Sequence, residues 1–105
     1  MKSPRWLPKT IGQIQQLVQA GHVRFTLKAL RELTTLELSL DETDICEILA
    51  GLHESDFRSR IISTITQEYL YVFSPKVADV EMYLKVVIRV NCVVISFHED
   101  LTNEN

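Results

Sequence analysis

Apolar residues follow two different spacings along the chain, and the change comes after Glu54. Before it they recur every three to four residues, which is typical of amphipathic helices. This half predicts, in chain order, an irregular arm, a helix, a short extended piece and two further helices, at residues 1–9, 10–20, 22–25, 26–33 and 41–51. The third helix has the clearest stripe, formed by Ile45, Ile48, Leu49 and Leu52.

Capping residues set the predicted helix boundaries. Thr10 and Gln13 have the spacing of a capping box, in which two side chains satisfy free amides at the helix start. Gly21 can end that helix because glycine adopts the left-handed conformation without penalty. Asp41 is placed to cap the third helix.

After Glu54 the chain is rich in Val, Ile, Tyr and Phe, as strands are. Strands are predicted at Asp56–Thr64, Tyr69–Phe73, Asp79–Val90 and Cys92–Phe97, with Asn91 in a hairpin between the last two. Asp79–Val90 alternates, so its even-numbered residues share one face and its odd-numbered residues the other. Cys92–Phe97 is almost entirely apolar, which favours a central strand covered on both faces.

Helices followed by consecutive strands predict an α+β domain, with the helices on one face of an antiparallel sheet. The 105 residues, 46% of them apolar, fit one domain over residues 1–105 with a single core. No apolar run approaches the ~18 residues of a membrane helix. The basic start lacks the apolar stretch of a secretory signal, so we expect a cytoplasmic protein. The acidic end, residues 99–105, is expected to be frayed.

Metal, redox and nucleotide chemistry are disfavoured. Cys46 and Cys92 lie in apolar runs and have no metal-binding or redox spacing, so we interpret them as reduced, buried thiols. His22, His53 and His98 have no ligand spacing with each other or with the cysteines. The 3 glycines are too scattered for a phosphate-binding loop. We therefore expect no metal and no cofactor.

Charge is distributed unevenly behind the net charge of −3. Residues 1–31 contain six Lys or Arg and no acidic residue, whereas the rest contain five Lys or Arg against all 14 acidic residues. A polyanionic partner would have to meet a local basic surface. The alternative is that this bias serves only solubility.

The polar face of the long strand carries the candidate chemistry. Tyr83, Lys85 and Arg89 alternate along it, Arg58 and Arg60 are expected to share a face of the preceding strand, and His98 follows the last strand. Metal-free RNA cleavage needs a base for the 2′-hydroxyl, a cation for the phosphorane and an acid for the leaving oxygen. Such side chains are more often simply the solvated face of a sheet.

Several segments, taken together and in order, resemble the MqsR-type toxin family. The similarity covers about residues 10–98 and is carried by Leu17–Arg24, Ala29-Leu30, Gly51–Phe57, Val72–Lys76, Tyr83-Leu84-Lys85 and Ile95-Ser96-Phe97. The resemblance implies a RelE-like ribonuclease fold and cleavage of mRNA at short GC-containing triplets. It also implies neutralisation by an MqsA-type antitoxin with a zinc-binding domain and a helix-turn-helix domain. Any contact with DNA would be made through that antitoxin.

Only part of the family's site matches directly. Tyr83 and Lys85 match the family's Tyr-x-Lys strand. The position of a family lysine is Ser59 here, and Arg60 could replace it after a small local shift. A family glutamine falls at Leu70, where Gln67 or Glu68 could substitute if the loop differs, and a family lysine falls at His98.

The predicted site therefore combines catalytic residues with RNA-binding residues. The catalytic residues are Arg60, Tyr83, Lys85 and His98, and the RNA-binding residues are Arg58, Lys76 and Arg89. The leading hypothesis is a metal-independent endoribonuclease toxin that inhibits translation. The alternatives are a non-catalytic module that binds an antitoxin or RNA, and a plain α+β domain that shares only the fold.

Overall fold

The computed structural model describes residues 3–101. Its elements are α1 (Leu7–Gln19), β1 (Val23–Phe25), α2 (Leu27–Thr35), α3 (Glu42–Ala50), the 3-10 helix η1 (Glu54–Asp56), β2 (Phe57–Ile62), β3 (Tyr69–Phe73), β4 (Lys76–Val77), β5 (Val80–Ile88) and β6 (Cys92–Glu99). This order of helices and then strands confirms the α+β class.

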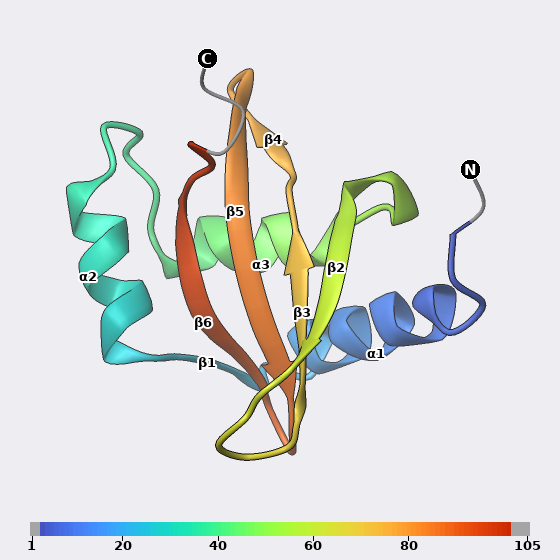
Figure 1. Ribbon diagram of the computed structural model, residues 1–105. Coiled ribbons are helices and arrows are strands. Elements are labelled where there is room, and N and C mark those ends of the chain that lie inside the picture. The colour runs from blue at the N-terminus through green and yellow to red at the C-terminus, as the bar shows by residue number, and fades with distance from the viewer. Residues whose placement is uncertain (1–2, 102–105) are drawn as a thin grey trace.

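The strands form one mixed sheet in the order β1-β6-β5-β3-β2, and β4 pairs with β5 (Figure 1). All pairs formed among β2, β3, β4, β5 and β6 are antiparallel, as expected. The short piece Val23–Phe25 adds a parallel pair with Cys92–Val94, so the expectation of a purely antiparallel sheet is wrong at this edge. The long stretch of chain between β1 and β6 provides the crossover connection that a parallel pair requires.

The core lies between α1, α3 and one face of the sheet (Figure 1). Ile14 from α1 and Leu49 from α3 are fully buried against Leu84 and Phe97 from the two central strands. Each such side chain contributes roughly 1.5–3 kcal/mol when it is transferred from water. The other face of β5 and β6 carries no helix, so the apolar character of Cys92–Phe97 does not reflect cover on both faces.

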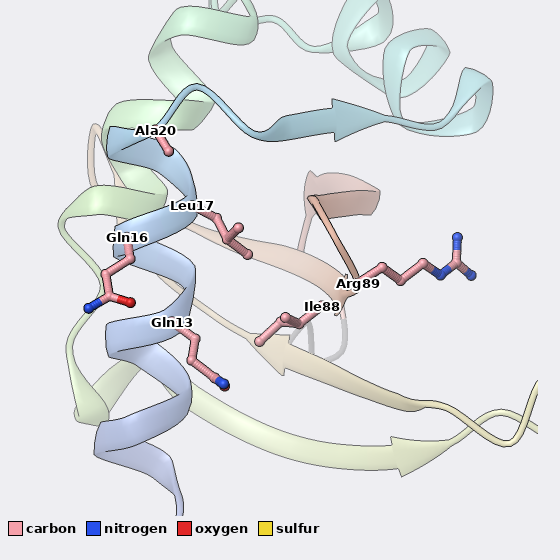
Figure 2. Close-up of a pocket in the computed structure, with 6 residues that line it drawn as sticks. All are labelled: Gln13, Gln16, Leu17, Ala20, Ile88 and Arg89. Atoms are coloured by element: carbon pink, nitrogen blue, oxygen red, sulfur yellow. The ribbon is translucent and has the colours of Figure 1, made fainter.

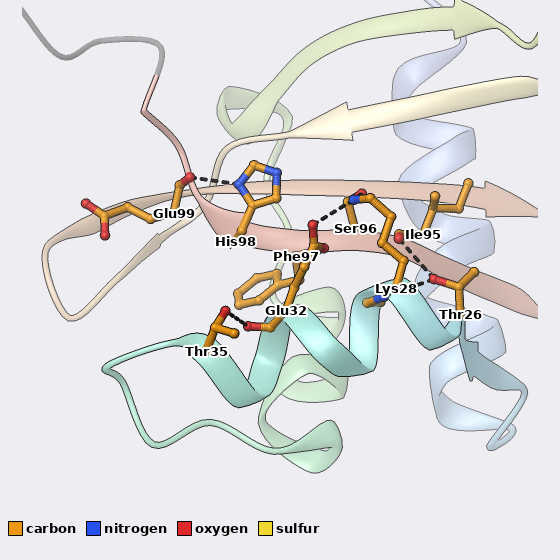
Figure 3. A network of polar contacts seen from close by, with 10 residues as sticks. Thr26, Lys28, Glu32, Thr35, Ile95, Ser96, Phe97, His98 and Glu99 are labelled. Atoms are coloured by element: carbon orange, nitrogen blue, oxygen red, sulfur yellow. Dashed lines mark hydrogen bonds and ion pairs between the residues drawn. The ribbon is translucent and has the colours of Figure 1, made fainter.

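Helix α2 closes the edge of β6 beyond the end of β1. The Thr26 amide donates to the Val94 carbonyl at 3.0 Å, and the Thr26 hydroxyl donates to the Ile95 carbonyl at 3.0 Å. The Phe97 amide donates to the Glu32 carboxylate at 2.9 Å (Figure 3). These bonds satisfy strand groups that would otherwise form an open edge.

The N-terminal helix differs from its prediction. It begins at Leu7 and not at Thr10, so residues 7–9 are helical and do not belong to an irregular arm. Pro8 suits the first helical turn because its missing N–H needs no partner there. Thr10 is buried against the core and does not cap the helix.

Strand ends also differ slightly from the predicted bounds. β6 continues to Glu99, because Glu99 still pairs with Met82. β5 ends at Ile88, and the Arg89 amide donates to the Asn91 carbonyl in the hairpin. The expectation of a frayed tail falls mainly on residues 102–105, outside the described part of the chain. Among the described helices, none has the length and apolar character needed to cross a membrane.

The Thr26 contacts predict a specific loss of stability. The Thr26 hydroxyl also accepts a hydrogen bond from the Ala29 amide, so it caps α2 and binds β6 at once. We expect Thr26→Val to lower the free energy of unfolding by about 1–2 kcal/mol in urea denaturation. Thr35→Val, which removes an exposed hydroxyl bonded within α2, is the control. Equal losses in the two variants would contradict the edge-closing role of α2.

Candidate functional site: the open face of the sheet

Alternation along β5 separates the core from an open face. Met82, Leu84 and Val86 are fully buried beneath the helices, whereas Tyr83 and Lys85 are only partly buried on the opposite face. Directly paired residues on antiparallel strands share a face. The pairing register of β5 with β3 and β6 therefore identifies the residues that share the open face with Tyr83 and Lys85.

Tyr83 and His98 form the first row of this open face. They are paired across β5 and β6, and their rings are stacked with centroids 4.8 Å apart and an interplanar angle of 9°. His98 Nδ1 lies 2.8 Å from the Glu99 carbonyl oxygen. Because a carbonyl only accepts, Nδ1 must carry the proton, and Nε2 of the neutral ring is left as an acceptor.

Lys85 lies in the next row, which runs from β2 to β6. It pairs with Ser96 on β6 and with Val72 on β3, and Val72 pairs with Ser59 on β2. Lys85 is half-buried, and it forms no ion pair within residues 3–101. Its positive charge is therefore available to an incoming anion.

Arg58 and Lys76 flank the Tyr83 end of the open face. The guanidinium of Arg58 donates to the Glu81 carboxylate at 2.5 Å, and Lys76 is paired with Glu81 across β4 and β5. Glu81 precedes Tyr83 by two residues on the same strand face. Both cations therefore lie near the row of Tyr83 and His98.

Arg89 lies just beyond the far end of β5, in the hairpin. Its guanidinium forms two 2.8 Å hydrogen bonds with the Glu68 carboxylate. It lies six positions after Tyr83, which corresponds to about 20 Å along a strand. The hydrogen bonds from Arg89, then that from Thr66, lower the pKa of Glu68 from 4.5 to about 2.

Arg60 does not join the open face. It pairs with Tyr71, which in turn pairs with the buried Val86, so it lies on the helix-bearing face. Its guanidinium carbon lies 4.2 Å from the centre of the Trp6 ring and 4.0 Å from that of Tyr69. The expectation that Arg60 meets Tyr83, Lys85 and His98 in one patch is wrong.

A β-bulge explains this difference. The register shifts between Phe57, which pairs with Phe73, and Ser59, which pairs with Val72. Arg58 is the extra residue, so Arg58 and Arg60 do not share a face as simple alternation predicted. Ser59 therefore takes the open-face position of its row.

Leu70 also lies on the open face. It pairs with Val87, which belongs to the odd-numbered face of β5 together with Tyr83 and Lys85. Gln67 and Glu68 do not replace it. Gln67 adopts a positive φ of 64° in the turn before β3, and Glu68 is held by Arg89. Two of the positions that depart from the resemblance, Ser59 and Leu70, thus face the site without a charged group.

Two residues at this face were not predicted from the sequence. Lys28 on α2 donates to the Ser96 hydroxyl at 2.6 Å and to Glu32 at 2.6 Å (Figure 3). Burial alone would raise the pKa of the Glu32 carboxyl. The hydrogen bonds from Lys28 and Phe97, with the charge of Lys28, hold this pKa below its ordinary value. The four-residue spacing of Lys28 and Glu32 is that of a helical ion pair, but nothing in the local sequence places this pair beside β6.

The thiols and the cavities lie apart from the open face. Burial and then the nearby Cys46 raise the pKa of the Cys92 thiol to about 12, so it is unreactive at neutral pH. Within residues 3–101 no group of three or more His, Cys, Asp or Glu side chains could hold a metal ion. A cavity of about 390 Å³ between α1 and the end of β5 contacts Arg89 alone among the predicted site residues, and its guanidinium points away from α1 (Figure 2).

Comparison with known proteins decides the family. A family model described as "Motility quorum-sensing regulator, toxin of MqsA" matches residues 9–99. The chain belongs to the MqsR toxin family. It is 36% identical over 93 residues to the mRNA interferase toxin MqsR of Escherichia coli K12, covering 85% of this chain and 90% of that protein. The expected family is confirmed, and the mixed sheet with its helices is this chain's version of the MqsR fold.

The position of Arg60 predicts a structural role. Two cation–π contacts at partly exposed sites stabilise a fold by about 1–2 kcal/mol together. We expect Arg60→Ala to lower the free energy of unfolding by that amount in urea denaturation. Arg24→Ala, which removes an exposed guanidinium bonded only to a neighbouring carbonyl, is the control. An unchanged stability for Arg60→Ala would contradict a stabilising role for its contacts with Trp6 and Tyr69.

The pair of Arg89 and Glu68 predicts a pH dependence. The folded-state pKa of Glu68 is depressed, so the stability from this pair is present above pH 4.5 and is lost as pH falls toward about 2. We expect the wild type to be more stable than Arg89→Gln at pH 5, with the difference shrinking progressively at pH 4, 3 and 2. Urea denaturation at each pH measures the difference in the free energy of unfolding between the two proteins. A difference that does not change with pH would contradict the depressed pKa of Glu68.

Proposed function

We propose that this protein is the toxin of a toxin-antitoxin pair and cleaves mRNA as a metal-independent endoribonuclease, with Tyr83, Lys85 and His98 as its catalytic residues. One observation carries the assignment of residues. The stacked pair of Tyr83 and His98 lies one row from Lys85 on a face without a helix. A base, an acid and a cation are thus adjacent. The mRNA interferase name of the Escherichia coli relative supports the choice of substrate.

The chemistry follows from the protonation of these groups. Nε2 of His98 takes the proton of the 2′-hydroxyl, and the resulting oxygen attacks the adjacent phosphorus. The bond from the 2′ oxygen to phosphorus forms while the bond to the 5′ oxygen breaks. Tyr83 donates its phenolic proton to the leaving 5′ oxygen, and Lys85 stabilises the negative charge of the phosphorane. The products are a 2′,3′-cyclic phosphate and a free 5′-hydroxyl.

The shape and charge of the open face suit single-stranded RNA. An accessible sheet face exposes the tyrosine and histidine rings, on which bases can stack. Arg58 and Lys76 lie at the Tyr83 end and are placed to bind neighbouring phosphates. Arg89 is about 20 Å from Tyr83, so it can meet only a more distant nucleotide.

The decisive experiment is digestion of mRNA by purified protein in EDTA. We expect cleavage by the wild type and a loss of about 10²-fold or more in rate for both His98→Ala and Tyr83→Phe. His22→Ala and Tyr69→Phe, which alter exposed residues outside the open face, are the matched controls. Arg60→Ala should cleave like the wild type once its folding is verified.

Two results would overturn the enzyme assignment. The first is intact RNA at high protein concentration together with no growth arrest on expression. The second is equal cleavage by the wild type and His98→Ala. A substrate with 2′-deoxyribose at the scissile position should resist cleavage, because the attacking hydroxyl is absent.

A non-catalytic antitoxin- or RNA-binding module is the second candidate. The absence of a polar group at Leu70 and of a charge at Ser59 favours it, because these two positions face the site. It predicts that Tyr83→Phe and His98→Ala leave every cellular effect of the protein unchanged. A growth assay with the two variants separates the candidates.

The partner follows from the family description as a toxin of MqsA. We propose a cytoplasmic complex with an MqsA-like antitoxin that has a zinc-binding domain and a helix-turn-helix domain. A neighbouring reading frame with two CxxC pairs and a helix-turn-helix is the expected source. Co-expression should restore growth and yield a complex in size-exclusion chromatography. Failure to bind that product would contradict this partner.

A further inference from the structure

The row of Lys85 ends in a second cation that the proposed mechanism does not use. From β2 to β6 the row consists of Ser59, Val72, Lys85 and Ser96, and the ammonium of Lys28 continues it at 2.6 Å from the Ser96 hydroxyl. The row is therefore uncharged at its β2 and β3 end and positive from β5 to α2.

Lys28 reaches this position from outside the sheet. Figure 3 shows its side chain rising from α2 past β6, on the same side as Ser96 and His98. Its neighbour Glu32 holds it there with a 2.6 Å ion pair, while the Phe97 amide fixes the Glu32 carboxylate. The Lys28 side chain nevertheless remains 60% exposed, so its ammonium can meet a further anion.

We propose that Lys28 is an RNA-binding residue of the open face and contacts a backbone phosphate next to the one at Lys85. The backbone would then cross β5, β6 and α2, and not β3 and β2. Glu32 is a positioning residue, because it orients Lys28 without facing the RNA itself. The inference rests on the proposed RNA substrate and adds the direction in which the strand runs.

Salt dependence distinguishes a phosphate-binding lysine from a structural one. For a single-stranded nucleic acid, removing one lysine that neutralises a phosphate reduces the slope of log affinity against log salt by about 0.7. A residue that only supports the fold would change stability without changing that slope. The probe is a fluorescent 2′-O-methyl oligoribonucleotide of about ten nucleotides, which binds but cannot be cleaved because its 2′ oxygens are blocked.

The variants separate the charge of Lys28 from its hydrogen bond. Lys28→Gln keeps a donor for the Ser96 hydroxyl but removes the charge, and we expect its slope to fall by about 0.7, as for Lys85→Ala. Lys28→Arg should keep the wild-type slope. Lys9→Ala is the matched control, because Lys9 is an exposed lysine on α1, behind the sheet. Glu32→Gln can still accept from Phe97 but loses the ion pair that holds Lys28, so we expect it to weaken binding by about 2- to 5-fold at low salt.

The outcomes also separate this inference from the proposed function. If the wild type cleaves RNA and Lys28→Gln keeps the full slope, the enzyme assignment stands and the role of Lys28 is wrong. If the wild type binds the probe with a Lys28-dependent slope but cleaves nothing, the role of Lys28 stands and the enzyme assignment fails. An absence of probe binding by the folded wild type in 50 mM salt would overturn the inference as well.

Discussion

The two-residue alternation of β5 is the constraint on which both the core and the candidate site depend. β5 pairs with β6 on one side and with β3 on the other, so its faces determine theirs. Leu84 and Val86 turn toward the helices, and Tyr83 and Lys85 therefore turn away. A shift of the β5 register by one residue would expose Leu84 and Val86 and bury Tyr83 and Lys85. The burial of apolar side chains thus fixes which face carries the proposed catalytic residues Tyr83 and Lys85.

This dependence explains which parts of the site could be predicted from the sequence. The alternation within β5 is local and visible, so the shared face of Tyr83 and Lys85 follows directly from it. The face of Arg60 depends on a bulge at Arg58, where one extra residue inverts the count for the rest of the strand. No residue type near Arg58 marks such an insertion. Simple alternation of side chains therefore predicts the correct sheet face for residues of β5 but not for Arg60 in β2.

Non-local contacts account for the remaining differences in the fold. The spacing of Thr10 and Gln13 satisfies a capping rule, but the core buries Thr10 and the helix starts a turn earlier. The contact of Thr26 with Ile95 joins residues 69 positions apart, so neither segment alone indicates it. The type and order of the longer elements were predicted because they depend on local periodicity, whereas the short η1 and β4 were not predicted. The role of α2 as the cover of a strand edge depends on tertiary structure.

The arrangement of charges explains how a chain with a net charge of −3 can present a surface for a polyanion. Three cations around the open face have carboxylate partners, namely Arg58 with Glu81, Arg89 with Glu68 and Lys28 with Glu32. Exposed pairs of this kind add little stability, because solvent screens them. They do hold long side chains in place, and a phosphate must compete with the carboxylates to bind. Lys85 has no such partner within residues 3–101, so in the proposed function it is the position where an RNA phosphate would gain most. The unpaired lysine, rather than the total charge, would then direct an RNA substrate to the row beside Tyr83 and His98.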